Sequence, residues 1–149
     1  MSVRRNIGGE LRRREFLGLC ASIAALPVLG ACASVLVRQV PLTNGRVELP
    51  LSQYPELREP GNALQILPNG ETDPLIVLVD AEGKHTVVSS QCTHRGCTVE
   101  AQRDRIVCPC HGSTYDRKGE VLRGPAQRPL RRYQSQLTAD GVLVIQLGS

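Results

Sequence analysis

Cysteine and histidine are concentrated in one stretch of the chain, from Cys92 to Tyr115. The stretch reads Cys-Thr-His-Arg-Gly-Cys over residues 92–97 and Cys-Pro-Cys-His-Gly-Ser-Thr-Tyr over residues 108–115. These motifs hold four of the six cysteines and two of the three histidines of the 149-residue chain. Thiolate and imidazole are good metal ligands, and packing alone does not explain such a concentration. The stretch therefore predicts a metal centre, and the fold must bring its two halves together.

The spacing within the motifs leaves the identity of the metal open. Each motif supplies one thiol and one imidazole, as Cys92-x-His94 and as Cys108-x-x-His111. Two cysteines and two histidines suit a tetrahedral zinc ion. The same donors suit a two-iron cluster that is held by two cysteines on one iron and by two histidines on the other. A zinc site would leave the remaining two cysteines of the motifs as spare thiols.

The paired motifs resemble those of Rieske iron–sulfur proteins, and more narrowly the disulfide-containing kind found in quinol-oxidising cytochrome complexes. Gly124-Pro125-Ala126 is similar to the family's proline loop, which covers the cluster. The resemblance implies one [2Fe-2S] cluster, and it assigns roles as follows: ligands Cys92, His94, Cys108 and His111, a disulfide between Cys97 and Cys110, and hydrogen bonds to sulfur from Ser113 and Tyr115. Because such donors stabilise the added electron, we expect a potential in the upper half of the family range of about −150 to +300 mV.

The resemblance implies one-electron transfer, with enzymatic activity only as part of a complex. The partner would be a quinol-oxidising cytochrome subunit, a c-type cytochrome or another redox protein. Exposed histidine ligands would couple the electron to a proton, which suits a quinol donor. Two alternatives remain. A cytosolic Rieske ferredoxin of an oxygenase system would carry neither the Cys97 and Cys110 pair nor an export signal, and a zinc-stapled binding module would have no redox role.

Two residues near the motifs differ from the quinol-oxidising members of the family. Arg95 stands at the cluster tip, where those proteins usually carry an apolar residue that docks into a cytochrome subunit. A guanidinium is costly to bury there unless it is paired. Gln127 replaces the second proline of the usual Gly-Pro-Ala-Pro loop. Both residues bear on the partner of the protein and leave the cluster prediction unchanged.

The N-terminal segment predicts export and attachment to a membrane. Arg13 and Arg14 precede 22 uncharged residues, which resembles a twin-arginine signal. Residues 29–32 (Leu-Gly-Ala-Cys) resemble a lipobox ending at Cys32, and the apolar run 16–31 is short for a membrane span. Lipidation at Cys32 is favoured over an uncleaved anchor or a released product. We therefore expect a signal or anchor segment over residues 1–32, a Rieske domain over residues 33–149, and a location at the periplasmic face of the inner membrane.

The net charge of +4 lies in the N-terminal segment. Residues 1–38 carry six arginines and two glutamates, whereas residues 39–149 carry twelve basic and twelve acidic side chains. This distribution gives no support to nucleic-acid binding. Six basic residues nevertheless gather between Arg117 and Arg132. They could steer an acidic redox partner or form an ordinary solvated loop surface.

Short β-rich segments separated by turn residues predict an all-β sandwich or small barrel with antiparallel pairing. We expect hairpins around Asn44-Gly45, joining residues 35–40 to 46–51, and around Asp140-Gly141, joining 133–138 to 142–147. Further strands are expected at residues 63–67, 75–79, 85–89, 97–100 and 105–107. Residues 121–122 are too short to predict more than a bridge.

Overall fold

The computed structural model describes residues 36–148, and the regular structure of this range is almost entirely β. The strands are β1 (Val37–Val40), β2 (Arg46–Pro50), β3 (Ala63–Pro68), β4 (Leu75–Val79), β5 (His85–Ser89), β6 (Glu100–Ala101), β7 (Ile106–Val107), β8 (Thr114–Tyr115), β9 (Val121–Arg123), β10 (Arg132–Leu137) and β11 (Val142–Gln146). Over residues 36–148 the only helical element is a 3₁₀ turn, η1 (Pro55–Arg58). The predicted all-β fold is confirmed.

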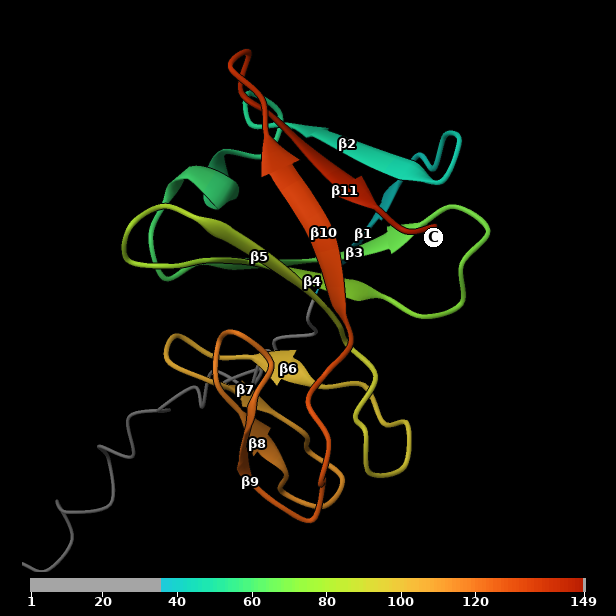
Figure 1. The fold of residues 1–149 in the computed structure, drawn as a ribbon, viewed down its shortest axis with the longest axis vertical. Helices are drawn as coiled ribbons and strands as arrows, with labels where there is room; N and C mark the ends of the chain where they lie inside the picture. The colour runs from blue at the N-terminus through green and yellow to red at the C-terminus, as the bar shows by residue number, and fades with distance from the viewer. Residues whose placement is uncertain (1–35, 149) are drawn as a thin grey trace, which may run out of the picture. The chain divides into compact units, whose positions relative to one another are not determined.

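The strands form two sheets (Figure 1). Seven strands make a nearly closed sheet in the order β1-β3-β4-β5-β10-β11-β2, and β6-β7-β8-β9 make a smaller sheet of four. The smaller sheet is inserted in the sequence between β5 and β10, which are neighbours in the larger one. The two motifs predicted to bind metal fall within this insertion, so it forms the subdomain that we expect to hold the cluster.

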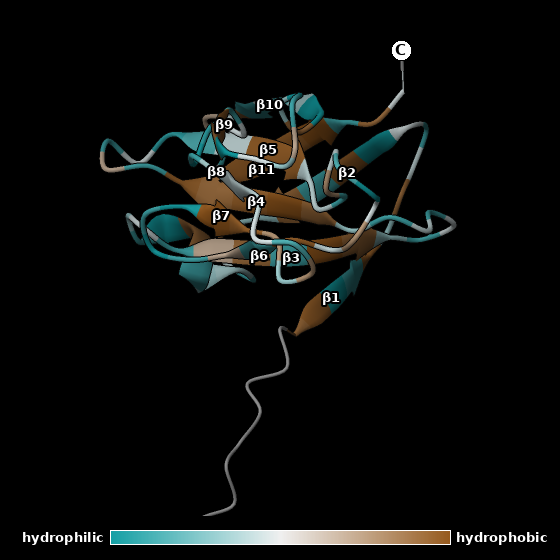
Figure 2. Cartoon of the chain, turned by 90° about the horizontal axis from the view of Figure 1, so that it is seen from below, coloured by the Kyte–Doolittle hydropathy of each residue, from teal (hydrophilic) through white to brown (hydrophobic). Residues whose placement is uncertain are grey.

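Strand β4 connects the larger sheet to the subdomain through its two faces. Its sequence Leu-Ile-Val-Leu-Val is buried at all five positions, and Figure 2 shows the strand in the brown of hydrophobic residues. Alternate side chains of a strand point to opposite faces. Val77 accordingly belongs to the core of the larger sheet, whereas Ile76 and Leu78 share a second core with Cys92 and Cys108. The aliphatic run that predicted a strand thus supports the metal-binding motifs directly.

The turn predicted at Asn44-Gly45 is present, but the prediction that its flanking strands pair with each other is wrong. The turn itself forms, with hydrogen bonds of 2.9 Å in both directions between Thr43 and Arg46 and positive φ angles at Asn44 (50°) and Gly45 (71°). The flanking strands then separate: β1 pairs in parallel with β3, and β2 pairs in antiparallel fashion with β11. The five-residue ladder with β11 accompanies complete burial of two side chains of β2, and this burial outweighs the local preference for a hairpin.

The C-terminal hairpin is confirmed, since β10 and β11 pair in antiparallel register with Leu137 opposite Leu143. The short strands of the subdomain were predicted less well. The strand expected at residues 97–100 is reduced to β6 and an isolated bridge between Gln91 and Thr98. Residues 121–122, expected to form a bridge at most, belong to the three-residue strand β9. Strands this short are fixed by their neighbours more than by their own sequence.

The N-terminal predictions lie outside the described residues. They concern the export signal with Arg13 and Arg14, lipidation at Cys32, and the boundary between residues 32 and 33. Within residues 36–148, none of the helical structure has the length and apolar character that crossing a membrane requires.

Candidate metal centre

The first motif forms a closed loop between β5 and β6. The N–H of Cys92 donates to the carbonyl of Cys97 at 2.8 Å, and the N–H of Gly96 donates to the carbonyl of Cys92 at 2.8 Å. Gly96 has a φ of 79°, in the left-handed region that glycine adopts without steric cost. The loop therefore turns back on Cys92 and carries His94 within it.

The second motif repeats this hydrogen-bonding pattern between β7 and β8. The N–H of Cys108 donates to the carbonyl of Ser113 at 2.8 Å, and the N–H of Gly112 donates to the carbonyl of Cys108 at 3.0 Å. Gly112 has a φ of 74° and has open space where a Cβ would stand, so its conformation is what favours glycine. Both motifs share the spacing Cys-x-x-x-Gly, which is the sequence signal of this equivalence.

The four candidate ligands lie at different depths. Cys92 and Cys108 are buried, with 2% and 1% of their surface exposed, and neither is part of a disulfide. His94 is half-buried and His111 is exposed. The two imidazole rings meet edge to face, with their centroids 4.8 Å apart. The predicted ligands are thus ordered from the core outward, with thiols inside and imidazoles outside.

These residues fit a two-iron cluster. The Nδ1 atom of His94 is buried and has no hydrogen-bond partner. Leaving a buried polar nitrogen unpaired costs free energy, which a bond to a metal would remove. Two buried thiols beside two neighbouring imidazoles also supply the Cys₂His₂ donor set that such a cluster requires.

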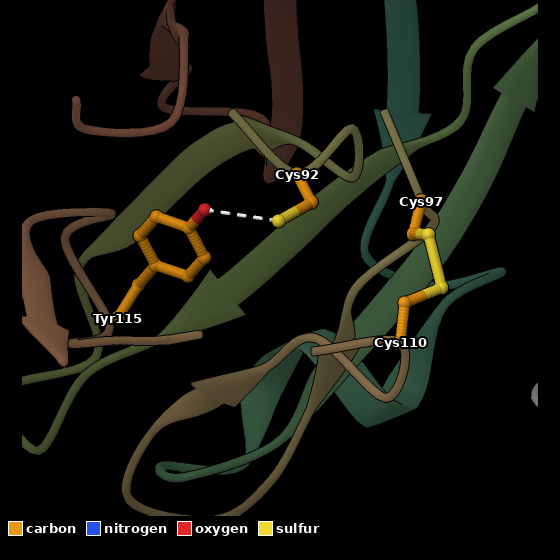
Figure 3. The surroundings of a disulfide bond; sticks show 4 residues. All are labelled: Cys92, Cys97, Cys110 and Tyr115. Atoms are coloured by element: carbon orange, nitrogen blue, oxygen red, sulfur yellow. Dashed lines mark hydrogen bonds between the residues drawn. A yellow bond between two sulfur atoms is a disulfide. The ribbon is translucent and has the colours of Figure 1, made fainter. Parts of the chain in front are cut away.

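A disulfide joins the two loops. Cys97 and Cys110 are bonded with an S–S distance of 2.12 Å and a Cα–Cα distance of 6.5 Å, as the resemblance implied (Figure 3). The sulfur atoms of Cys97, Cys108 and Cys110 lie within 4.8 Å of one another. Because two of these three sulfurs are bonded to each other, the trio is not itself a metal site. It shows instead that the disulfide packs against the candidate ligand Cys108.

Tyr115 places its hydroxyl beside the first loop. The Oη atom lies 3.3 Å from Cys92 Sγ, a contact that Figure 3 draws as a dashed line. It also lies 3.1 Å from Thr93 Oγ1 and 3.2 Å from the backbone nitrogen of Thr93, whose N–H donates to it. Thr93 Oγ1 donates its own proton to the Arg128 carbonyl at 2.6 Å, so toward Tyr115 it can only accept. The phenol proton is therefore shared between Cys92 and Thr93. The motif spacing does not single out Thr93, so the sequence does not predict this contact.

Burial and hydrogen bonding act differently on the two buried thiols. Burial raises the pKa of Cys108, and the hydrogen bond with Cys92 raises it further. Burial also raises the pKa of Cys92, but hydrogen bonds, of which that of Tyr115 is the largest, outweigh burial and lower it. Burial and the Cys92 sulfur raise the pKa of Tyr115 above its usual value near 10. The phenol consequently stays protonated at neutral pH and is available as a donor to sulfur.

Ser113 connects the second loop to the segment Gly124–Ala126. The N–H of Ala126 donates to Ser113 Oγ at 3.0 Å, and both residues are buried. The hydroxyl proton of Ser113 remains free to donate in another direction. Pro125 and His94 line a common hollow of about 440 Å³. The segment predicted to cover the cluster therefore lies beside one of the candidate ligands.

Arg117 links the subdomain to the larger sheet. Its guanidinium donates to four backbone carbonyls, at Asn62 (2.6 Å), Gln102 (2.7 Å), Arg103 (3.1 Å) and Val79 (3.2 Å). Burial lowers the pKa of Arg117, whereas the charges of Asp104 and Asp80 raise it. In the sequence Arg117 belongs to a basic run, and nothing there indicates this structural role.

Residues 49–134 match the family model described as the Rieske [2Fe-2S] domain. The chain belongs to the Rieske [2Fe-2S] family. Two relatives of this Rieske protein are named cytochrome b6-f complex iron-sulfur subunit. The one from Chlorobaculum tepidum is 30% identical, over 94% of this chain and 78% of the relative. The one from Prochlorococcus marinus strain MIT 9515 is 33% identical, over 92% and 86%.

Solved structures also resemble this Rieske protein. The cyanobacterial plasma membrane Rieske protein from Synechocystis PCC 6803 has a TM-score of 0.47 and 29% identity, over 67% of this chain and 85% of that one. A quaternary ammonium Rieske monooxygenase in complex with L-carnitine has a TM-score of 0.54 and 16% identity, over 64% and 30%. The second likeness extends to the fold alone.

Membership of the family establishes the cofactor and the chemistry. The protein binds one [2Fe-2S] cluster and transfers electrons through it. The [2Fe-2S] cluster therefore replaces a zinc ion as the interpretation of the Cys₂His₂ set, and the zinc-stapled module is excluded. The Cys97–Cys110 disulfide also weighs against the cytosolic ferredoxin alternative, which was expected to lack that pair.

Proposed function

We propose that this Rieske protein is the iron–sulfur subunit of a quinol-oxidising cytochrome complex at the periplasmic face of the inner membrane. The observation that carries the proposal is the Cys₂His₂ set, tied by the Cys97–Cys110 disulfide, in a chain similar over most of its length to cytochrome b6-f iron–sulfur subunits. A c-type cytochrome would then accept the electron.

Within this proposal, Cys92 and Cys108 hold the cluster on its buried side, and His94 and His111 hold it on its exposed side. When bound, the cluster takes up and returns one electron. The Tyr115 hydroxyl donates to Cys92 Sγ and stabilises the negative charge that reduction adds. Because Nδ1 of His94 faces inward, its Nε2 atom is the one that can give a proton to solvent or take one from a quinol.

The N-terminal segment fits the same location. We propose that Arg13 and Arg14 direct export of the folded chain, and that Cys32 carries a lipid anchor in preference to an uncleaved helix. A disulfide such as Cys97–Cys110 persists in an oxidising compartment. Export and the disulfide thus support one another.

Arg95 favours a second candidate function, that of a membrane-tethered carrier outside any quinol-oxidising complex. Its side chain is exposed, next to His94 in the first loop. Docking this tip into an apolar crater would bury an unpaired guanidinium, at a cost of several kcal/mol. A carrier that meets its partner across a polar surface avoids that cost.

Purification of the full chain from membranes in mild detergent tests the proposal. We expect the EPR spectrum of a reduced, nitrogen-ligated two-iron cluster, and co-purification with a b-type cytochrome whose quinol oxidation requires this chain. A cluster-bearing protein that purifies without cytochrome b would support the carrier. A colourless protein without the EPR signal would contradict both functions. Cys92→Ser is the matched control and should lose the signal.

A further inference from the structure

The described residues have an uneven distribution of charge. Residues 116–132 carry six basic and two acidic side chains, a net charge of +4. The other residues of 36–148 carry seven basic and ten acidic side chains, a net charge of −3. The positive segment follows directly after the second metal-binding motif. The domain is therefore electrically polar, and such a charge distribution orients a charged partner before contact.

The part of this segment closest to the first loop is held in place by backbone hydrogen bonds. The Ala126 N–H donates to Ser113 Oγ at 3.0 Å, and the Arg128 carbonyl accepts from Thr93 Oγ1 at 2.6 Å. Two residues further on, the Leu130 N–H donates to a carbonyl at 2.9 Å, and the Arg131 carbonyl accepts from an N–H of β5 at 2.8 Å. The arginines of this segment therefore project from an ordered base, unlike those of a freely solvated loop.

Basic residues lie near His94. Arg128 lines both hollows that His94 lines, one of about 380 Å³ and the other of about 440 Å³. Arg131 lines the first of these and lies over the Tyr133 ring at 4.9 Å from its centroid. Arg95 is exposed in the loop next to His94. We call Arg95, Arg128 and Arg131 the basic rim.

The basic rim has no ion-pair partner over residues 36–148, where the ion pairs involve other arginines. Asp73 is the one acidic side chain lining the two hollows, and its carboxylate accepts a hydrogen bond from Gln91 at 3.3 Å. Three arginines against one carboxylate leave the surroundings of this candidate ligand, through which electrons would leave, with a net positive charge. Exposed charges that are unpaired within a chain are free to pair across an interface.

We propose that the basic rim is the docking surface for an acidic redox protein, whose carboxylates surround its own redox centre. The inference rests on the proposed electron-transfer function and adds the charge of the partner to it. A partner that contacts the rim approaches the exposed side of His94, where electron transfer is shortest. Carboxylates are the complement because arginine binds them through two parallel hydrogen bonds.

Oxidation of the reduced full chain by small ions of opposite charge tests this surface. In each reaction the cluster loses one electron, either to ferricyanide, an anion, or to tris(phenanthroline)cobalt(III), a cation. Stopped-flow rates are compared at about 10 mM and about 1 M ionic strength, where charges are screened beyond about 30 Å and about 3 Å respectively. We expect the ferricyanide rate to fall about tenfold with salt and the cobalt rate to rise.

A variant pair separates the rim from the net charge. Arg128→Gln with Arg131→Gln should lose most of the salt dependence with ferricyanide. The control pair, Arg46→Gln with Arg58→Gln, removes the same charge at residues that line neither hollow. This pair should keep the salt dependence of the ferricyanide rate. Equal effects of the two pairs, or no salt dependence in the unmodified chain, would overturn the proposal. If the cluster is oxidised at a rate that does not depend on salt, the docking proposal is wrong and the electron-transfer function is still supported. If no oxidation occurs, the electron-transfer function itself is contradicted.

The kind of partner is tested by shielding. A polyglutamate peptide stands in for an acidic protein surface, and should bind the full chain in calorimetry and slow its oxidation by ferricyanide. Both effects should disappear in the Arg128→Gln, Arg131→Gln variant. If anionic phosphatidylglycerol vesicles slow the reaction through these two arginines and polyglutamate does not, the rim faces a lipid surface, and the proposal of a protein partner is wrong.

Discussion

At the scale of single residues, Tyr115 shows how one buried oxygen can serve several neighbours. It is completely buried, and its Oη atom lies within hydrogen-bonding distance of Cys92 and of two atoms of Thr93. The motif predicted Tyr115 because its position relative to the cysteines is fixed in sequence. Thr93 was not predicted, because its role depends on the Arg128 carbonyl, 35 positions away.

Replacement of Tyr115 by phenylalanine removes the donor to Cys92 Sγ and keeps the ring. Reduction adds negative charge to the cluster, so loss of the donor disfavours the reduced state. We expect the midpoint potential to fall by about 60 mV, which corresponds to about 1.4 kcal/mol for one electron. A redox titration followed by EPR measures this. Tyr54→Phe, in the core of the larger sheet, is the control and should leave the potential unchanged. An unchanged potential in Tyr115→Phe would show that the hydroxyl has only a structural role.

At the scale of secondary-structure elements, two devices hold the subdomain together and fix it to the larger sheet. The Cys97–Cys110 disulfide joins the two loops across 13 positions of sequence. Arg117 joins the segment after β8 to the ends of other elements, with Asn62 lying 55 positions away in sequence. Hydrogen bonds from one guanidinium to four backbone carbonyls cannot be predicted from the sequence, because every residue has a backbone carbonyl whatever its type.

Replacement of Arg117 by methionine removes the hydrogen bonds to four carbonyls while keeping an unbranched side chain. We expect the free energy of unfolding to fall by about 2 kcal/mol, because four hydrogen bonds from a charged donor are lost, one of them to the part-buried Val79 carbonyl. Urea denaturation measures the change. Lys118→Met is the matched control, since it removes one positive charge from a neighbouring exposed side chain. Equal destabilisation by both variants would indicate that charge, and not the link, is responsible.

Replacement of Cys97 by serine opens the disulfide and keeps the four candidate ligands. Closing a loop of this length restricts the unfolded chain by about 3 kcal/mol in the chain-entropy account. We expect a lower melting temperature, with the same loss in the double variant Cys97→Ser, Cys110→Ser. Dithiothreitol should lower the melting temperature of the unmodified chain and leave both variants unaffected. A variant that melts as the unmodified protein does would contradict a stabilising role for the bridge.

At the scale of the whole molecule, local patterns were predicted and distant pairings were not. The Asn44-Gly45 turn is correct because its conformation depends on the two residues that form it. The partner of β2 was mistaken because it lies in β11, with Arg46 opposite Gln146 at the far end of the chain. The same distinction holds in the metal centre. The cysteines and histidines follow a local spacing, whereas the contacts that position them come from segments brought together only by folding.

Both hydrophobic cores are built from residues between Val40 and Ile145, with Leu147 packed against the first. A fragment of residues 36–149 should therefore fold, bind the cluster and give the EPR spectrum of the full chain. Its melting temperature should match that of the full chain, because the fragment keeps every residue of these two cores over residues 36–148. The fragment should also leave the membrane fraction if residues 1–35 carry the anchor, and Cys32→Ser in the full chain separates lipidation from a spanning helix. A fragment that stays with the membrane through a cytochrome would place the attachment in the domain itself.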